Sequence, residues 1–115
     1  MNGDLGRQKK HLWRRRAQRM DVPLPAFWGL AEDDCQEVGI AQGLSRGGCF
    51  VEALVDELRA ETICLRVLLP TGRWLKLRAE AVYYASGRGI GASFTGISDE
   101  DAAMIDLVTE HYGAE

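Results

Sequence analysis

The sequence predicts a mostly β domain, in which a small antiparallel barrel or sandwich is followed by a C-terminal helix and preceded by a basic arm. Three observations lead to this prediction. Short apolar or alternating runs recur between turn residues from residue 26 to residue 94, the last segment has helical periodicity behind a capping serine, and the first 19 residues carry seven basic groups and one acid. With 115 residues, 46% of them hydrophobic, the chain is long enough for one domain with its own core.

The basic arm is the first segment of this layout. Residues 1–19 have a net charge of +6, whereas the remaining chain has seven basic and sixteen acidic groups and a net charge of −9. The few apolar residues of the arm form at most a marginal helix, so we expect a mobile arm that orders on contact with an anionic partner. We therefore divide the chain into an arm, residues 1–20, and a barrel with its helix, residues 21–115.

The barrel strands follow from alternation and turn residues. Pro23 and Pro25 favour extended backbone. The expected strands are 26–30, 37–42, 49–51, 62–69, 74–84 and 90–94, with a glycine-rich turn at 43–48. The clearest alternation lies in the expected strand 74–84. Its apolar side carries Leu75, Leu77, Ala79 and Ala81, and its opposite, charged side carries Lys76, Arg78 and Glu80.

The last segment is typical of a helix. Ser98 is an N-cap followed by three acids, which stabilise the first turn through the helix dipole. Ile105, Val108 and Tyr112 then repeat at helical spacing and predict a helix over residues 98–112 with one buried face.

Composition predicts several absences. The three cysteines, Cys35, Cys49 and Cys64, are odd in number and far apart, and the two histidines, His11 and His111, lie at opposite ends. We therefore expect no disulfide, no metal site and no cofactor. No run approaches the roughly 20 apolar residues that span a bilayer, and no apolar stretch follows the basic start, so we expect a cytoplasmic protein without membrane contact.

Two segments predict an anion site. Arg14, Arg15, Arg16 and Arg19 supply guanidinium groups, and residues 43–48, Gly-Leu-Ser-Arg-Gly-Gly, supply a glycine-rich backbone. The planar guanidinium pairs bidentately with phosphate oxygens or with the O6 and N7 edge of guanine, and it also stacks on bases. This combination indicates an anionic ligand with planar edges, such as a cyclic dinucleotide.

These residues resemble the PilZ family, whose members are six-stranded antiparallel β-barrels with a C-terminal helix that bind cyclic di-GMP. The first family motif, two arginines separated by three residues, is matched by Arg15 and Arg19, and Arg14 matches the additional arginine of some members. The second motif, Asp or Asn, any residue, Ser, any two residues and Gly, aligns with residues 43–48. Ser45 and Gly48 match it, whereas Gly43 replaces the acid or amide.

The resemblance implies a role for each matched residue. It implies that Arg15 and Arg19 contact phosphate and guanine, and that Arg14 favours a stacked pair of ligand molecules. Ser45 hydrogen-bonds the ligand from the barrel, and Gly47 and Gly48 allow close backbone approach. The alternative to these ligand-binding roles is a structural one, in which Gly47-Gly48 is a tight turn between strands and Ser45 caps it. Gly43 offers no side-chain hydrogen bond, so we expect the missing group to weaken binding by roughly ten- to a hundredfold.

Three other functions are weighed against the receptor. A PilZ-like adaptor that binds a downstream protein without nucleotide is the main alternative, and Gly43 motivates it. A nucleic-acid-binding arm is less favoured, because phosphate neutralisation dominates such binding and the body is acidic. An enzyme is not expected: Gly43-Leu44-Ser45-Arg46-Gly47 fits a nucleophile-elbow pattern but lacks the α/β context that the elbow requires.

Overall fold

A computed structural model describes residues 19–20, 22–30, 35–55 and 62–112 of the chain. These residues form six strands and one helix: β1 (Leu24–Gly29), β2 (Glu37–Ser45), β3 (Gly48–Glu52), β4 (Thr62–Leu68), β5 (Trp74–Ala85), β6 (Gly89–Thr95) and α2 (Asp99–Tyr112). All the strand pairs are antiparallel, and they close into a barrel in the order β1-β2-β3-β6-β5-β4. The predicted fold class, a six-stranded antiparallel barrel with a C-terminal helix, is confirmed.

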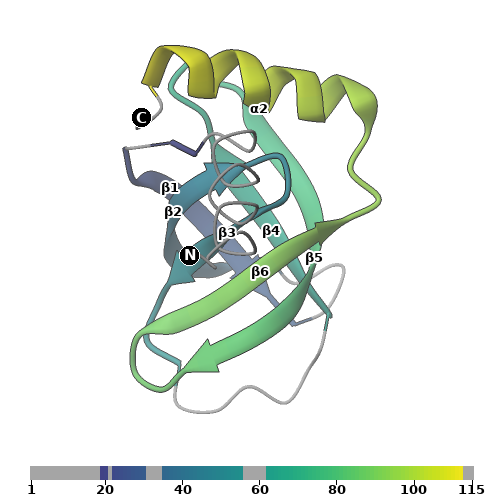
Figure 1. Cartoon of the computed structure of the whole chain (residues 1–115). Coiled ribbons are helices and arrows are strands. Elements are labelled where there is room, and N and C mark those ends of the chain that lie inside the picture. The colour runs from purple at the N-terminus through teal and green to yellow at the C-terminus, as the bar shows by residue number, and fades with distance from the viewer. Residues whose placement is uncertain (1–18, 21, 31–34, 56–61, 113–115) are drawn as a thin grey trace, which may run out of the picture.

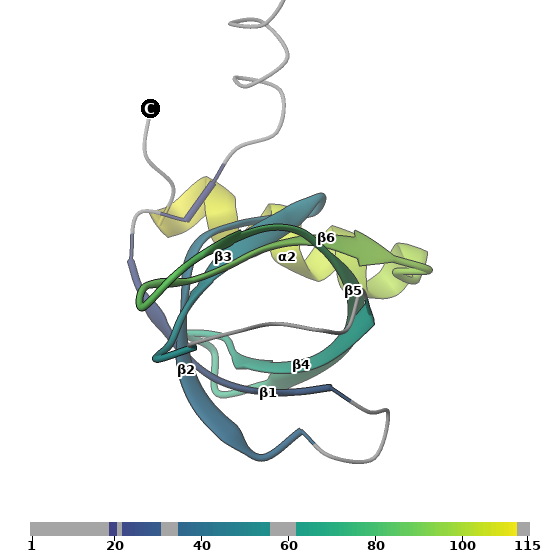
Figure 2. The same ribbon diagram turned by 90° about the horizontal axis from the view of Figure 1, so that it is seen from below.

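The barrel interior is built by the alternation that the sequence predicts. Leu75, Leu77 and Ala79 of β5 are buried, and Ala81 is half-buried, whereas the charged residues between them are exposed. Successive side chains of a strand point to opposite faces, so one face of each strand fills the barrel and the other faces outward. Figure 2, a view into the ring of strands, shows how the six strands surround this interior.

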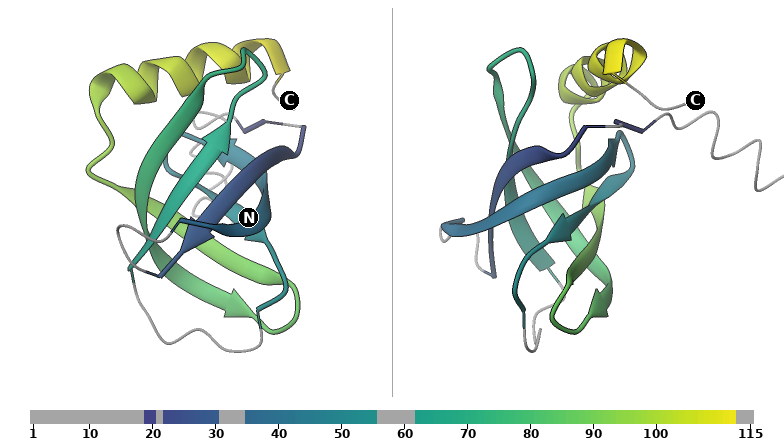
Figure 3. Two further views of the ribbon diagram at one scale, coloured as in Figure 1. Left: turned by 180° about the vertical axis from the view of Figure 1, so that it is seen from behind. Right: turned by 90° about the vertical axis from the view of Figure 1, so that its left-hand side faces the viewer.

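Helix α2 lies across one end of the barrel and packs against β2 (Figures 1 and 3). The Ser98 hydroxyl accepts the backbone N–H of Asp101 at 3.0 Å, which satisfies one donor of the first helical turn. Ile105 and Val108 are buried as predicted. The prediction for Tyr112 is wrong: its side chain is 46% exposed, because the buried face of the helix continues through Thr109 instead.

The turn after β2 is shorter than predicted. Strand β2 continues to Ser45 and β3 begins at Gly48, so that only Arg46 and Gly47 lie between them rather than the whole segment 43–48. The register between β2 and β3 shifts by one residue between Gln42 and Ser45. Gly43 lies within this shift and has a φ of 62°. A β-bulge with glycine in the left-handed conformation therefore replaces the expected loop.

Candidate functional site

The backbone at residue 19 is fixed beside the end of β2. The N–H of Met20 donates to the carbonyl of Leu44 at 2.7 Å, and the Met20 side chain, only 3% exposed, belongs to the hydrophobic core. Barrel packing therefore includes the last residue of the segment that the sequence assigns to the arm. Arg19 precedes this anchor and is exposed.

Arg19 and Gly43 are neighbours in space. A Cβ atom placed on Gly43 would lie 3.9 Å from Cδ of Arg19, an ordinary van der Waals distance. Arg19, the second arginine of the first motif, is thus adjacent to Gly43, the first position of the second motif. The sequence predicts this proximity only through the family resemblance, because 23 intervening residues separate the two positions.

The left-handed backbone at Gly43 explains which residue types suit this position. Glycine adopts positive φ without steric cost, and Asn and Asp are the side-chain-bearing residues that tolerate it best. These are the same residue types that the resemblance implies here. The sequence alone indicates only that Gly43 lacks a hydrogen-bonding side chain, and it gives no sign of this backbone requirement.

The Ser45 side chain organises the β2–β3 hairpin. Its hydroxyl accepts the N–H of Gly47 at 3.2 Å and lies 3.5 Å from the carbonyl oxygen of Gly48, and the residue is only 7% exposed. The longer contact is a weak one for a hydroxyl donor. These contacts support the structural interpretation, in which Ser45 caps the turn.

The two glycines of the hairpin differ in their surroundings. A Cβ on Gly48 would overlap the backbone carbonyl of Ala92 on β6, so that only glycine fits between the strands. A Cβ on Gly47 would meet nothing closer than the Ser45 hydroxyl oxygen at 3.9 Å, and Gly47 is exposed. Packing alone therefore explains Gly48, whereas Gly47 presents open backbone at the surface.

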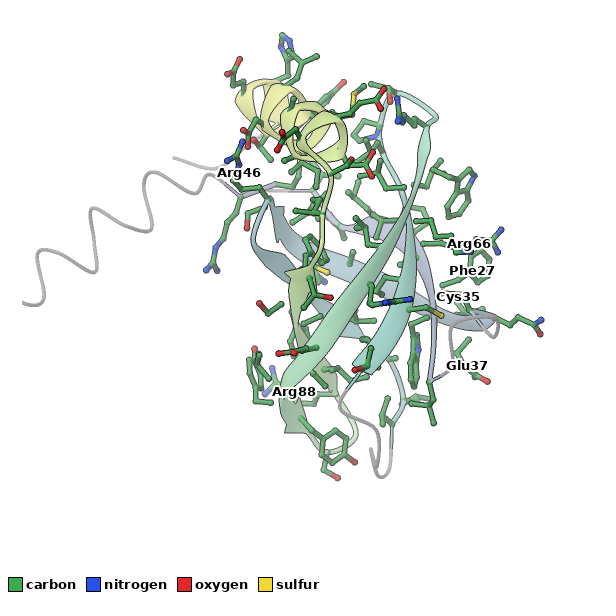
Figure 4. The ribbon with its side chains drawn as sticks, turned by 90° about the vertical axis from the view of Figure 1, so that its right-hand side faces the viewer. Phe27, Cys35, Glu37, Arg46, Arg66 and Arg88 are labelled. Carbon is green, nitrogen blue, oxygen red and sulfur yellow. The ribbon has the colours of Figure 1, made fainter. Side chains whose placement is uncertain are left out.

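Arg46 joins the hairpin to the C-terminal helix. Its Nε lies 3.3 Å from Oδ1 of Asp106 on α2, and its Nη2 contacts Oδ2 of the same carboxylate. This bidentate pair raises the pKa of Arg46 above its ordinary value. Arg46 is therefore an ion-pair partner of the helix, and Figure 4 shows it at the helix end of the barrel.

An aromatic pair lies on the outer wall near the hairpin. Phe50 of β3 is opposite Gln42 of β2, and its ring stacks on that of Tyr83 with centroids 6.0 Å apart. The Tyr83 side chain is 58% exposed and covers Gly91, where a Cβ would overlap its ring. Sequence reasoning missed this pair, because a register shift in β5 between Ala81 and Tyr83 brings Tyr83 to the outer face.

The predicted residues are only partly described. Arg14 and Arg15 lie outside the described residues, whereas Arg19, Ser45 and the two hairpin glycines gather around the end of β2. Within the described ranges, no three His, Cys, Asp or Glu side chains come together to hold a metal ion. Over those same ranges, no helix has the length and apolar character needed to cross a bilayer.

Comparisons with known proteins place this fold. No protein-family model and no curated protein sequence matches the chain. Among solved structures, the PilZ domain of CeSA from a cellulose-synthesizing bacterium matches with a TM-score of 0.59 and 25% identity, over 81% of this chain and 96% of that one. The Bacillus subtilis inhibitor of motility, MotI/DgrA, matches with a TM-score of 0.65 and 17% identity, over 85% of this chain. This chain spans about half, 51%, of the length of MotI/DgrA.

The closed barrel, the C-terminal helix and these two similarities define the class: the chain is a PilZ-like domain.

Proposed function

We propose that this chain is a receptor domain for cyclic di-GMP, which it holds between the arginines of its N-terminal segment and the β2–β3 hairpin. The observation that supports the proposal most directly is the position of Arg19. Its backbone is anchored to β2 through Met20, and its side chain lies beside Gly43. Arg19 of the first motif and Gly43 of the second, which lie apart in the sequence, are therefore neighbours beside the end of β2.

The chemistry of these groups suits the ligand. Cyclic di-GMP offers two phosphates and two guanines, and an arginine fork pairs with either. The exposed backbone of Gly47 permits close approach from the hairpin side. In this proposal Arg14 and Arg15 complete the set of guanidinium groups, Ser45 holds the hairpin in shape, and Arg14 favours a second, stacked ligand molecule.

The proposed output is a change of surface. Ligand binding closes residues 7–20 over the hairpin, and a downstream protein distinguishes the closed form from the open one. The proposal places this signalling in the cytoplasm of a bacterium and assigns the chain no catalytic step.

The test compares two arginine variants. Arg19→Ala removes the guanidinium group at the proposed site. Arg88→Ala is the control, because it removes the same charge at the other end of the barrel. Figure 4 shows Arg88 far from Arg46, which belongs to the β2–β3 hairpin. Calorimetric titration with cyclic di-GMP should show a loss of about a hundredfold in affinity for Arg19→Ala and none for Arg88→Ala. Equal affinities in both variants would contradict the proposal.

A protein-binding adaptor that lacks nucleotide binding is the second candidate, and one observation favours it. Trp74 is 46% exposed and stacks on Phe27 with ring centroids 5.7 Å apart. Beside them, Arg66 and Lys76 are directly opposite each other across β4 and β5. Directly opposed like charges destabilise a sheet, so this exposed face suits an acidic protein partner that neutralises them. Saturable nucleotide binding by the unaltered chain would remove this candidate.

A further inference from the structure

Two of the three cysteine thiols meet on the outer wall of the barrel. Cys64 of β4 alternates with the inward-facing Ile63 and Leu65, so its side chain points outward, and it is opposite Gly29 of β1. Glycine has no side chain to cover this position, yet Cys64 is only 6% exposed. Cys35 is the neighbouring thiol: Cys64 contributes to the raised pKa of Cys35, and both residues are buried beside the end of β1, Cys35 against Phe27 and Cys64 opposite Gly29.

Cys35 is itself held in place. Its Sγ lies 3.7 Å from the carbonyl oxygen of Phe27 on β1, and the residue is 6% exposed. Figure 4 shows Cys35 beside Phe27 and Arg66 on the side of the barrel. The contact therefore joins the chain just before β2 to strand β4, across the intervening strand β1.

The third cysteine has different surroundings. Cys49 of β3 points into the barrel and belongs to the hydrophobic core. All three thiols are free. The chain thus contains a contacting pair and an isolated, buried cysteine that serves as an internal control.

We propose that Cys35 and Cys64 are a modification site that forms a reversible intramolecular disulfide. The oxidant in this proposal is a low-molecular-weight disulfide. One thiol loses its proton and attacks a sulfur of the oxidant, which forms a mixed disulfide and releases one small thiol. The second protein thiol then attacks the mixed disulfide, forms the Cys35–Cys64 bond and releases a second small thiol. The protein loses two electrons and two protons, and the oxidant is reduced to two thiols.

The surroundings set the rate of this reaction. Burial and the neighbouring Cys64 raise the pKa of Cys35 to about 12, although the positive charges of Arg66 and Lys76 oppose the shift. At neutral pH the Cys35 thiol is protonated and is a poor nucleophile, since the thiolate is the reactive form. Attack by Cys35 is therefore slow, which suits a response to a sustained oxidising state rather than to a brief pulse of oxidant.

The site is separate from the proposed nucleotide site. In the closed barrel, β4 is three strands away from β3, which carries the second half of the hairpin. The bond would constrain the chain between residues 35 and 64 in the unfolded state, which stabilises the folded domain. Its formation and any nucleotide binding can therefore be measured independently.

The experiment uses three full-length variants: Cys49→Ala, which keeps the pair, and Cys35→Ala and Cys64→Ala, which each break it. Each protein is equilibrated in glutathione buffers from fully reduced to fully oxidised, with moderate urea to allow exchange at buried thiols. Acid quenching and peptide mass spectrometry then locate every bond, and thermal unfolding is measured after the urea is removed.

We expect Cys49→Ala to form the bond between residues 35 and 64, to gain about 5–15 °C in Tm, and to lose both on return to reduced glutathione. Cys35→Ala and Cys64→Ala should yield only mixed disulfides with glutathione. The absence of the bond in fully oxidised Cys49→Ala would overturn the proposal, and so would a bond that lowers the Tm, because the folded barrel would then not accommodate it.

Discussion

The Cβ position of Gly43 lies 3.9 Å from Cδ of Arg19, so that a side chain added to the bulge of β2 would contact the arginine that precedes β1. This relationship brings one residue of each motif together in space. If the proposed receptor function holds, Gly43 is therefore the position at which a substitution should change the affinity for cyclic di-GMP.

Gly43→Asn should strengthen the binding of cyclic di-GMP by roughly ten- to a hundredfold, because the amide restores a hydrogen-bonding partner beside Arg19. Asn tolerates the φ of 62°, so the change should lower the free energy of unfolding by only about 1 kcal/mol. Calorimetry and urea denaturation measure the two effects. Gly43→Ala is the matched control, since it introduces the strain without the polar group. An equal gain in affinity for both variants would contradict the assigned role.

The two hairpin glycines should respond differently to alanine. Gly48→Ala forces a Cβ against the carbonyl of Ala92 and should lower the free energy of unfolding by about 2–4 kcal/mol. Gly47→Ala meets open space and should change it by less than about 0.5 kcal/mol. Urea denaturation monitored by circular dichroism distinguishes them. If Gly47→Ala folds normally yet binds cyclic di-GMP more weakly, the ligand approaches the hairpin backbone.

The helix cap offers a prediction that does not depend on ligand. Ser98→Ala removes the hydroxyl that accepts the N–H of Asp101 and should lower the free energy of unfolding by about 1 kcal/mol. The corresponding fall in Tm is about 4–8 °C for a domain of this size. Ser86→Ala in the exposed β5–β6 turn is the control and should leave the Tm unchanged. Equal Tm values for the two variants would show that the cap contributes little.

The buried thiol of Cys49 should make stability depend on alkaline pH. Burial raises the pKa of Cys49 from its ordinary value of 9.0 to about 12. The folded state therefore keeps the proton while the unfolded state loses it, so this contribution is complete below pH 9 and is lost as pH rises from 9 to 12. The urea midpoint of the unaltered protein should fall more steeply over this range than that of Cys49→Ala. Parallel curves would contradict the assignment.

The parts of this structure that depend on local pattern could be predicted from the sequence. The alternation in β5 and the capping serine before α2 are confirmed, because side-chain periodicity and caps are local properties. Arg46, by contrast, pairs with Asp106 on a distant element, and no local pattern indicates this contact.

The parts that depend on exact register could not be predicted. One extra residue in β2 shortens the turn and places Gly43 in the left-handed region, and no periodicity signals such a bulge. The sequence likewise gives no sign that Cys35 and Cys64 are neighbours, because the pairing of β1 with β4 that brings them together is long-range. Tyr83 reaches the outer face only through a second register shift.

Calorimetric titration of the purified 115-residue chain with cyclic di-GMP, with GTP as control, is the first measurement to make on this PilZ-like domain. We expect saturable binding that is selective over GTP, and a ratio near two ligands per chain would assign the stacking role to Arg14. No binding of cyclic di-GMP at about 100 µM, a threshold near −5.5 kcal/mol, would rule out the proposed receptor and favour the adaptor.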